Sequence, residues 1–402
     1  MKQKRVIFLG GSYAQIPIIE DARERGWYVI TCDYLPDNPG HKLANEYHNI
    51  STTDREGILA LTKDLAPDFV IAYASDPAAL TAAYVSEQLG LPGNPYESIL
   101  LLSEKDLFRK FLRKNGFNSP QAVTINLDDD YIEKIKGFNY PFIIKPTDSS
   151  GSKGVTKVES LSQINIAYQY ALSFSRNKRI IVEEFIDTNG EQLHGDGFVY
   201  NGELIFYYLG NHHYNTNINP FVPYSTTWPC KISEKISLKI DAEIKKLISL
   251  SGFKNGAINI EIRILNSNKI FFMEIGPRSG GNFVPQVIKY ATNFDMVKAT
   301  LDFYEGRTIL RPNCHLKNNA AYYVIHSGIS GILKNLIIKD SIKKNIKEFH
   351  QYIRIGEKVN SFQGANAAIG ILLLIFDSTQ EMDYIIENMN KYIILQIEEK
   401  NT

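Results

Sequence analysis

A loop rich in serine and glycine lies near the middle of the chain. It reads Lys145-Pro-Thr-Asp-Ser-Ser-Gly-Ser-Lys-Gly154, and the apolar run Phe142–Lys145 precedes it. Small residues let the backbone approach a ligand closely, and successive N–H groups of such a turn can hold phosphate oxygens. Lys145 and Lys153 add positive charge. The loop predicts a phosphate-binding turn, and an ordinary solvent-exposed hairpin turn is the alternative.

Two glutamates are expected to face each other on neighbouring strands. The runs Ala257–Ile264 and Ile270–Ile275 read as strands, and a two-residue turn at 267–268 between them pairs Glu261 with Glu274. Two carboxylates about 5 Å apart repel each other unless a cation lies between them. Carboxylates are the ligands by which Mg²⁺ is usually held. The pair predicts a metal site, whereas a longer turn would shift the register and leave both acids in solvent.

Two further segments carry groups suited to a nucleotide. The run Ile181-Val-Glu-Glu-Phe-Ile186 could contact an adenine edge where the strand ends, and Glu191 could accept ribose hydroxyls. The run Gly276-Pro-Arg-Ser-Gly-Gly-Asn282 places Arg278 beside a Gly-Gly turn, and a guanidinium group binds phosphate or carboxylate in a bidentate way. Taken singly, the first segment is explained equally well as an exposed edge strand, and the second as a plain turn.

The elements that must position these residues fall into three parts. Over residues 1–95, apolar strand-like runs such as Val6–Leu9 alternate with helical runs, which predicts a parallel, doubly wound sheet. Residues 96–310 are rich in strands and predict an α+β domain. After Arg311-Pro312 the pattern changes again, and residues 311–402 predict a small C-terminal domain. The expected fold class is an α/β N-terminal parallel-sheet domain followed by an α+β domain and a small C-terminal α+β domain.

The composition narrows the classes of partner. The 402 residues include 44 basic and 44 acidic side chains, and this balance argues against nucleic acid or an anionic membrane as partner. Three widely spaced cysteines indicate neither a disulfide framework nor a cysteine zinc site. The N-terminal apolar run is too short for a signal peptide, and Ala367–Phe376 has about half the length of a membrane helix. We expect a cytoplasmic protein that acts on small molecules.

Taken together and in order, the motifs resemble the ATP-grasp superfamily over roughly residues 95–310. The matching elements are Lys105 within Ser103-Glu-Lys-Asp-Leu-Phe-Arg109, Lys145 with its loop, Val182–Ile186 with Glu191, and Glu261 with Glu274-Ile-Gly-Pro-Arg278. The resemblance implies an ATP-dependent carboxylate–amine ligase. In such an enzyme the substrate carboxylate attacks the γ-phosphate of MgATP, ADP leaves, and an amine displaces phosphate from the acyl phosphate.

The resemblance also implies roles for individual residues. Glu261 and Glu274 would bind Mg²⁺, which Mn²⁺ could replace, and Lys145 and Arg278 would act on the transferring phosphoryl group. The implied ATP contacts are Lys105, Lys145, Ser149, Ser150, Gly151, Ser152, Lys153, Gly154, Glu184, Phe185, Ile186 and Glu191. The number of metal ions stays open, because many members carry asparagine where this chain has Gly276, and Asn282 or water could take that place.

Several segments supply expected substrate contacts. Gly10-Gly11 and Ser75-Asp76 follow parallel strands, whose carboxyl ends bind ligands in doubly wound sheets. The run Asn211–Tyr224 is expected to be a loop over the reacting groups, with His213 or Tyr224 touching the acceptor. The turn after Arg278 adds the last contacts, which are Ser279, Gly280, Gly281 and Asn282.

The family branch and three other functions stay open. The Glu-Ile-Gly-Pro-Arg form looks like that of L-amino-acid ligases, whereas the Ser/Gly loop is also similar to phosphoribosylglycinamide-processing enzymes of purine synthesis. The latter would need a basic phosphate pocket, and the N-terminal region shows no decisive arginine cluster. A nicotinamide oxidoreductase is disfavoured because Ser12 and Gln15 stand where the Gly-x-Gly-x-x-Gly pattern needs glycines. A non-catalytic nucleotide sensor is the third alternative, and a homodimer is expected from the relatives.

Overall fold

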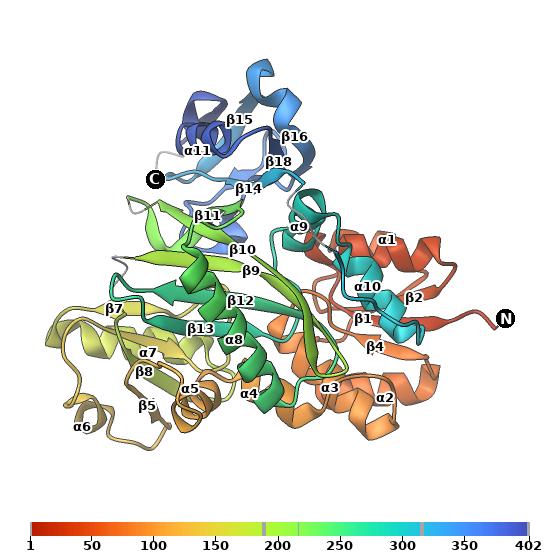
Figure 1. Cartoon of the computed structure of the whole chain (residues 1–402), viewed down its shortest axis with the longest axis horizontal. Helices are drawn as coiled ribbons and strands as arrows, with labels where there is room; N and C mark the ends of the chain where they lie inside the picture. The colour runs from red at the N-terminus through yellow and green to blue at the C-terminus, as the bar shows by residue number, and fades with distance from the viewer. Residues whose placement is uncertain (1, 187–189, 216, 314–316, 400–402) are drawn as a thin grey trace.

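The computed structural model describes residues 2–186, 190–215, 217–313 and 317–399, which form four β-sheets with helices around them (Figure 1). Six short 3-10 helices connect larger elements: η1 Tyr13–Gln15, η2 Pro39–Lys42, η3 Leu161–Gln163, η4 Asp340–Asn345, η5 Ala365–Ala367 and η6 Met389–Lys391. Within the described ranges, none of the helices combines the length and the hydropathy that a bilayer span requires.

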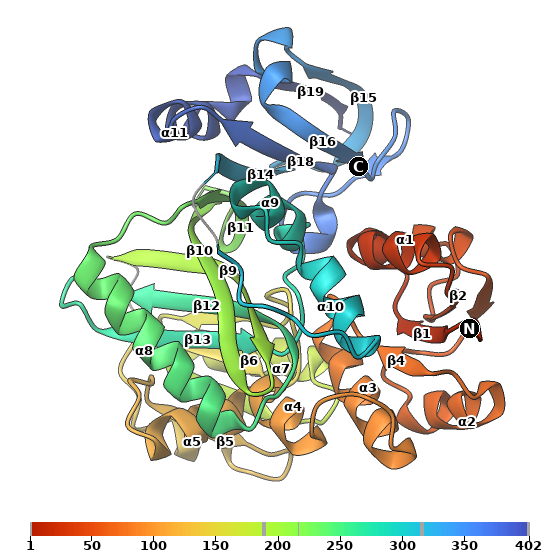
Figure 2. The same ribbon diagram turned by 45° about the vertical axis from the view of Figure 1, so that its right-hand side comes forward.

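The N-terminal sheet is parallel and has the strand order β3-β2-β1-β4, as the alternating pattern predicted. Its strands are β1 Arg5–Leu9, β2 Tyr28–Cys32, β3 Glu46–His48 and β4 Phe69–Ile71, and its helices are α1 Ile16–Glu24, α2 Arg55–Leu65 and α3 Asp76–Leu89. Helix α10, Met296–Tyr304, returns from far along the chain and packs Leu301 against Ile18 of α1 in the same core (Figure 2). This packing ties the N-terminal region to the segment that follows the central hairpin.

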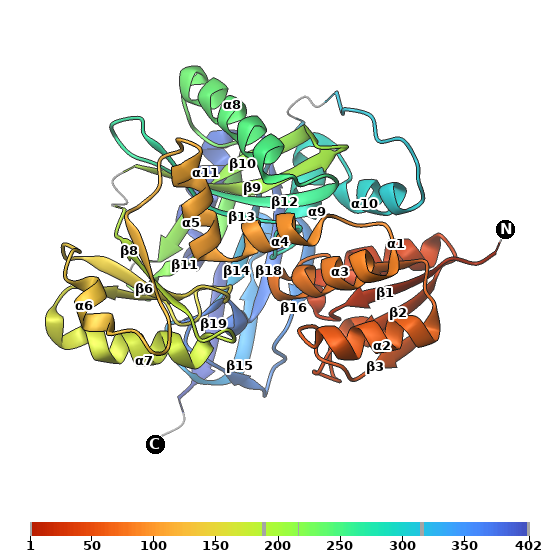
Figure 3. The ribbon, with the colours of Figure 1, turned by 90° about the horizontal axis from the view of Figure 1, so that it is seen from below.

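A small antiparallel sheet carries the serine- and glycine-rich loop. It has the order β5-β8-β6-β7 and lies apart from the N-terminal sheet, as the view from below shows (Figure 3). Its elements are β5 Ala122–Ile125, α6 Tyr131–Ile135, β6 Phe142–Pro146, β7 Thr156–Val158, α7 Ile164–Phe174 and β8 Ile180–Glu184. Apolar side chains of one sheet face, such as Ile144 and Val182, pack on α7. The opposite face is left for polar chemistry.

The central sheet has eight strands in the order β13-β12-β9-β10-β11-β14-β18-β16. The strands are β9 Glu191–Tyr200, β10 Glu203–Asn215, β11 Asn219–Trp228, β12 Gly256–Ile264, β13 Ile270–Gly276, β14 Asn319–Ile325, β16 Ile346–Gln351 and β18 Gly370–Phe376. Helix α8, Glu234–Ser251, buries Ile240, Ile244 and Leu247 at helical spacing and covers one face, together with α4 Tyr96–Ser103 and α5 Lys105–Lys114.

The hairpin of β12 and β13 reaches the predicted pairing by a different route. Its loop has three residues rather than two, since the Leu265 N–H donates to the carbonyl of Lys269 and Asn268 adopts φ 59°. This loop alone would shift the register by one residue. A bulge at Met273 restores it, so that Glu261 does lie opposite Glu274. The predicted two-residue turn was wrong, but the predicted pair is confirmed.

The C-terminal region extends the central sheet and adds a sheet of its own. β14, β18 and β16 belong to the central sheet, whereas β15 Gly331–Ile338, β17 Lys358–Val359 and β19 Ile393–Glu398 form the separate order β17-β15-β19. Helix α11, Thr379–Glu387, packs on β14 and β18, and α9, Val284–Thr292, lies on the other side of β14 and β18. The three-part fold class is confirmed, and the boundaries at 95 and 310 stay predictions.

Candidate active site

A cavity of about 330 Å³ opens between the small sheet and the central sheet. Most of the residues predicted from the motifs line it: Lys105, Lys145, Ser149, Ser150, Gly151, Ser152, Glu184, Phe185, Ile186, Glu261, Glu274, Arg278, Gly281 and Asn282. The remaining predicted residues, all described, are not part of its lining: Lys153, Gly154, Glu191, Gly10, Gly11, Ser75, Asp76, His213, Tyr224, Ser279 and Gly280.

Lys145 is held by a buried carboxylate. Its Nζ lies 2.6 Å from Oε2 of Glu183, and Nε of Arg109 lies 2.9 Å from Oε1 of the same side chain. Burial alone would raise the pKa of Glu183, but the charges of Arg109 and Lys145 lower it to about 2. Burial also lowers the pKa of Lys145, and Glu183 acts against this change. The contact with Glu183 therefore fixes the lysine in place at the cavity wall.

The serine- and glycine-rich loop contacts the start of helix α5. Gly151 and Ser152 both adopt positive φ, at 68° and 58°, which turns the chain sharply over the cavity. Nζ of Lys105 donates to the carbonyl of Ser149 at 2.6 Å and lies 3.9 Å from Oε2 of Glu274. Ser152 Oγ donates to the carbonyl of Phe221 on β11. The loop thus bridges the two sheets and brings a second lysine next to the glutamate pair.

A row of polar side chains crosses one face of the central sheet. On neighbouring strands, Glu274 lies opposite Glu261, and Glu261 lies opposite His194. His212 on β10 is the diagonal neighbour of His194, and it lies opposite Thr226 on β11. All of them except Thr226 line the cavity. The sheet register therefore sets carboxylates at one end of the row and imidazoles at the other.

Glu261 is a carboxyl group of this row whose pKa is raised. Burial and then the carboxylate of Glu274 raise the pKa of Glu261 to about 7. A divalent cation between the two carboxylates would remove this repulsion, and oxygen ligands of this kind fit Mg²⁺. The donor set thus fits the predicted metal, with Glu261 and Glu274 as the residues that would hold it.

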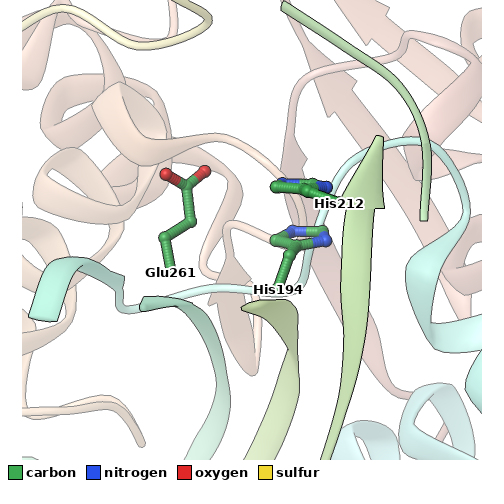
Figure 4. Close-up of side chains that lie close together, drawn as sticks. All are labelled: His194, His212 and Glu261. Carbon is green, nitrogen blue, oxygen red and sulfur yellow. The ribbon is translucent and has the colours of Figure 1, made fainter. Parts of the chain in front are cut away.

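The two imidazoles of the row do not extend this metal site in the arrangement observed. A nitrogen of each ring and a carboxylate oxygen of Glu261 lie within 4.8 Å of one another (Figure 4). However, the rings of His194 and His212 are stacked, with centroids 4.2 Å apart and planes 12° from parallel. Nitrogen lone pairs lie in the ring planes, so those of two stacked rings cannot converge on one ion. Burial is the main cause that lowers the pKa of His194 to about 3 and that of His212 well below its ordinary value, so both rings are neutral.

The structure brings His212 to the cavity and not the predicted His213. The run 211–224 is a strand pair rather than the predicted loop, because β10 extends to Asn215 and β11 begins at Asn219. Neighbouring residues on a strand face opposite sides, so only one of the two histidines can reach the cavity. It is His212, whereas His213 lies on the other face with its Nε2 2.9 Å from Thr227 Oγ1. Tyr224 belongs to a different cavity.

Arg278 is anchored by a residue of the N-terminal region. Its Nε and Nη2 lie 2.7 and 2.8 Å from the two carboxylate oxygens of Asp76, the first residue of α3. Burial opposes ionisation, but the guanidinium holds the pKa of Asp76 below its ordinary value. Gly276 is required beside this pair, since a Cβ there would lie 2.9 Å from Asp76 Oδ1. The space that asparagine fills in many ATP-grasp sequences is therefore taken by an ion pair here.

The remaining polar residues near the row form a buried network. Asn259 Nδ2 lies 2.9 Å from Nε2 of His194 and donates to Oδ1 of Asp196 at 2.8 Å. Oδ2 of Asp196 accepts the N–H of Gly280 at 2.8 Å, which fixes the turn after Arg278. Ser279 and Gly280 thus shape the turn, and Gly281 and Asn282 reach the cavity.

Apolar side chains also line the cavity. Ile143, Val155 and Met273 line it together with Phe185 and Ile186 at the end of β8. The expected ribose contact, Glu191, begins β9 outside the lining, and its carboxylate accepts a hydrogen bond from Nδ2 of Asn211 at 2.5 Å. Its predicted role with ATP stays a prediction.

The turn after β1 is filled by its own side chains. Gln15 is 4% exposed, and a Cβ on Gly10 would lie 3.1 Å from its Nε2. The ring of His41 packs against Gly11, and Pro17 near the start of α1 removes a backbone donor. The predicted contacts Gly10 and Gly11 are therefore not brought to the cavity, and a phosphate or dinucleotide would have to displace Gln15.

Comparisons with known proteins agree with this geometry. Residues 138–286 match the ATP-grasp domain family. A curated relative, a formate-dependent phosphoribosylglycinamide formyltransferase of Mycobacteroides abscessus, is 24% identical over 376 residues, which is 89% of each chain.

Solved structures share the fold over nearly the whole chain. An L-amino acid ligase from Bacillus licheniformis superposes with a TM-score of 0.84 at 18% identity, covering 99% of this chain and 100% of that one. A phosphoribosylglycinamide synthetase from Anaerococcus prevotii has the same identity and coverage with a TM-score of 0.76. Residues 138–286 therefore match an ATP-grasp domain, the whole chain shares the fold of these solved structures, and the cavity between the small and central sheets lies largely within the matched range.

Proposed function

We propose that the protein is an ATP-dependent carboxylate–amine ligase that forms an amide or peptide bond through an acyl phosphate. The observation that carries this proposal is the convergence of Lys105, Lys145, Glu261 and Glu274 on one cavity between two sheets. In the proposed reaction, an oxygen of the substrate carboxylate attacks the γ-phosphorus of ATP and ADP leaves. The amine then attacks the acyl carbon, and inorganic phosphate leaves as the amide forms.

The residues around the cavity match the demands of such a transfer, in which positioning and charge stabilisation dominate. Lys145 would donate to ATP phosphate oxygens from a position fixed by Glu183, and Lys105 would do so from the start of α5. Glu261 and Glu274 would hold Mg²⁺, which neutralises phosphate charge when bound, and Mn²⁺ could replace it. Arg278, which also lines the cavity, would face the carboxylate or the acyl phosphate.

Free amino acids are the substrate class that we favour. A phosphoribosyl substrate needs a site for its phosphate, and the usual place is the helix N-terminus after the first strand of a doubly wound sheet. Here Gln15 fills that turn, and the nearby Asp33 is 8% exposed and adds negative charge. Burial also lowers the pKa of His41, so this histidine does not supply a cation near neutral pH.

A purine-pathway formyltransferase is the second candidate, because the curated relative of that name matches 89% of this chain. It would use formate as the carboxylate and the amine of phosphoribosylglycinamide. Product analysis separates the two proposals: the protein with MgATP is incubated with pooled amino acids, or with formate and phosphoribosylglycinamide, and ADP, AMP and phosphate are followed.

The proposal expects ADP and phosphate only with the amino-acid pool, and fractions of the pool then identify the substrates. Turnover only with formate and phosphoribosylglycinamide would replace it with the second candidate. AMP and pyrophosphate would contradict the acyl phosphate. Glu274→Gln serves as the control for a contaminating ATPase, because it removes a proposed metal ligand and should abolish specific turnover.

We also propose that the protein works in the cytoplasm and as a homodimer. The composition and the burial of Cys32 are consistent with a reducing compartment. Sedimentation equilibrium measures the assembly directly, and a monomer mass at all concentrations would contradict the dimer.

A further inference from the structure

A second cavity lies behind the wall of the first. It has a volume of about 480 Å³ and opens between the β10–β11 hairpin, β14 and the C-terminal elements α11 and β19. The labels of α11, β11 and β14 locate this region at the junction of the central sheet and the C-terminal region (Figure 2). Tyr214 lines both cavities, so the two share a wall. No residue of the proposed ATP or metal site belongs to the lining of the second cavity.

Aromatic rings form one side of this second cavity. The rings of Tyr224 and Tyr323 meet edge to face at 5.6 Å, and the ring of His326 lies 5.6 Å from Tyr224 at an interplanar angle of 30°. Burial lowers the pKa of His326, and its Nδ1 donates to the carbonyl of Val324, so this ring is neutral. The three rings therefore line the cavity without positive charge, and the face of an aromatic ring carries the negative part of its quadrupole.

The charge of the cavity is negative. Among the described residues that line it, Glu387 at the end of α11 is the charged one. It lies near enough to Tyr224 to contribute, after burial, to the raised pKa of that phenol. Two lysines of the surrounding segments are engaged elsewhere: Lys231 pairs with Asp383, and Lys391 lies over the ring of Tyr384. Apolar side chains such as Met389 and Ile393 complete the wall.

We propose that this second cavity binds a small organic ammonium ion, whose charged head lies against the tyrosine rings near Glu387. Cations bind over aromatic faces through the quadrupole of the ring, and the carboxylate of Glu387, which is exposed at the cavity, adds to this attraction. An anion would meet the charge of Glu387, and a neutral molecule would gain nothing from it. Because Tyr214 also packs on His212 at 5.6 Å, the occupant contacts a side chain that borders the catalytic cavity.

The test is calorimetric titration of the full chain with choline chloride, in the absence of ATP. The neutral molecule of the same shape, 3,3-dimethylbutan-1-ol, is titrated in parallel at matched ionic strength. We expect saturable binding of choline and at least tenfold weaker binding of the alcohol. Equal affinity for both, or no saturable binding of choline, would overturn the proposal. Since neither result requires turnover, the outcome is independent of the proposed ligase reaction.

Variants test whether the ion binds in the second cavity. Glu387→Gln and Tyr323→Leu should each weaken choline binding about tenfold, which is the range of one cation–aromatic or charge contact. Tyr224→Phe keeps the ring and should bind within about twofold of wild type. Glu203→Gln, an exposed acid on β10, controls for net charge and should change nothing. Loss of binding in Glu274→Gln, with Glu387→Gln unaffected, would place choline at the metal carboxylates and overturn the proposal.

Kinetics distinguish two identities of the ammonium ion, the amine substrate of the reaction or a separate effector. If choline competes with the amine substrate found by product analysis, and Glu387→Gln raises the KM for that amine, the cavity receives the substrate. If choline changes kcat without competing, the ion is a separate effector.

Discussion

Asp76 holds both Nε and Nη2 of Arg278 across 202 positions of the chain, at 2.7 and 2.8 Å. The pair joins the start of α3 in the N-terminal sheet to the turn after β13 in the central sheet. The third nitrogen of Arg278, Nη1, donates to the carbonyl of Ser279, so the guanidinium is held in one position where it lines the catalytic cavity. The N-terminal region thus acts on the site through a positioning contact.

Replacing Asp76 with asparagine should slow the reaction without removing the substrates from the site. The variant keeps one acceptor but loses the second contact to Arg278, so the guanidinium would shift. A misplacement of about 1 Å in an active site costs about 100-fold in rate, and the shift of Arg278 should be smaller than that. We expect kcat to fall about 10- to 100-fold with little change in the KM for ATP. Asp340→Asn, in an exposed ion pair with Lys343, is the control. A purely structural role for Asp76 would instead lower thermal stability and leave kcat of the folded fraction unchanged.

Gly276→Asn tests why this chain departs from many ATP-grasp sequences. A Cβ at this position would lie 2.9 Å from Asp76 Oδ1, so any side chain pushes the carboxylate away from Arg278. We expect more than tenfold lower activity, and adding Asp76→Ala should cost little more, because both changes break the same pair. Additive losses in steady-state kinetics would contradict this account. Gly137→Ala, whose nearest contact would be an ordinary 4.0 Å, is the control for glycine replacement.

The part of the site that follows from local sequence could be predicted. Lys145 ends a strand and opens a loop of small residues, and both features are readable from residue types alone. The pairing of Glu261 with Glu274 was also predictable, but by two errors that cancel. A three-residue loop shifts the register by one, and the bulge at Met273 shifts it back. Nothing in the residue types around Met273 marks the bulge in advance.

Contacts between distant segments could not be predicted. Glu183 was visible in its strand, but only the pairing of β6 with β8 places it diagonally from Lys145 on one face. The sequence correctly predicted that His212 and His213 face opposite sides of their strand. Alternation alone does not say which side faces the cavity. The pairing of β10 with β9, which places His212 diagonally from His194, determines that it is the side of His212. His194 carried no signal, because its importance comes from lying opposite Glu261.

Lys145 and Arg109 share one carboxylate but should respond differently to removal. Arg109 is 0% exposed and also donates to the carbonyls of Phe272 and Met273, so Arg109→Met leaves several buried groups unpaired. We expect it to lower the free energy of unfolding by about 3–5 kcal/mol. Lys145→Met leaves Glu183 paired with Arg109 and should cost less stability but about a thousandfold in kcat. Urea unfolding and steady-state assays check both, and equal stability losses would contradict the division of roles.

The buried histidines predict a loss of stability in acid. The pKa of His194 is about 3 in the folded protein, mainly because of burial, whereas an unfolded histidine titrates near its ordinary value of about 6.5. Between these values the unfolded chain binds a proton that the folded chain does not, so the free energy of unfolding falls as the pH drops below about 6.5. One such group contributes a slope of up to about 1.4 kcal/mol per pH unit. His194→Gln, which keeps an acceptor for Asn259, should reduce the slope by about that amount between pH 6 and 4.5 in urea titrations. An unchanged slope would mean that His194 takes up a proton in the folded protein, and the neutral imidazole row would then be wrong.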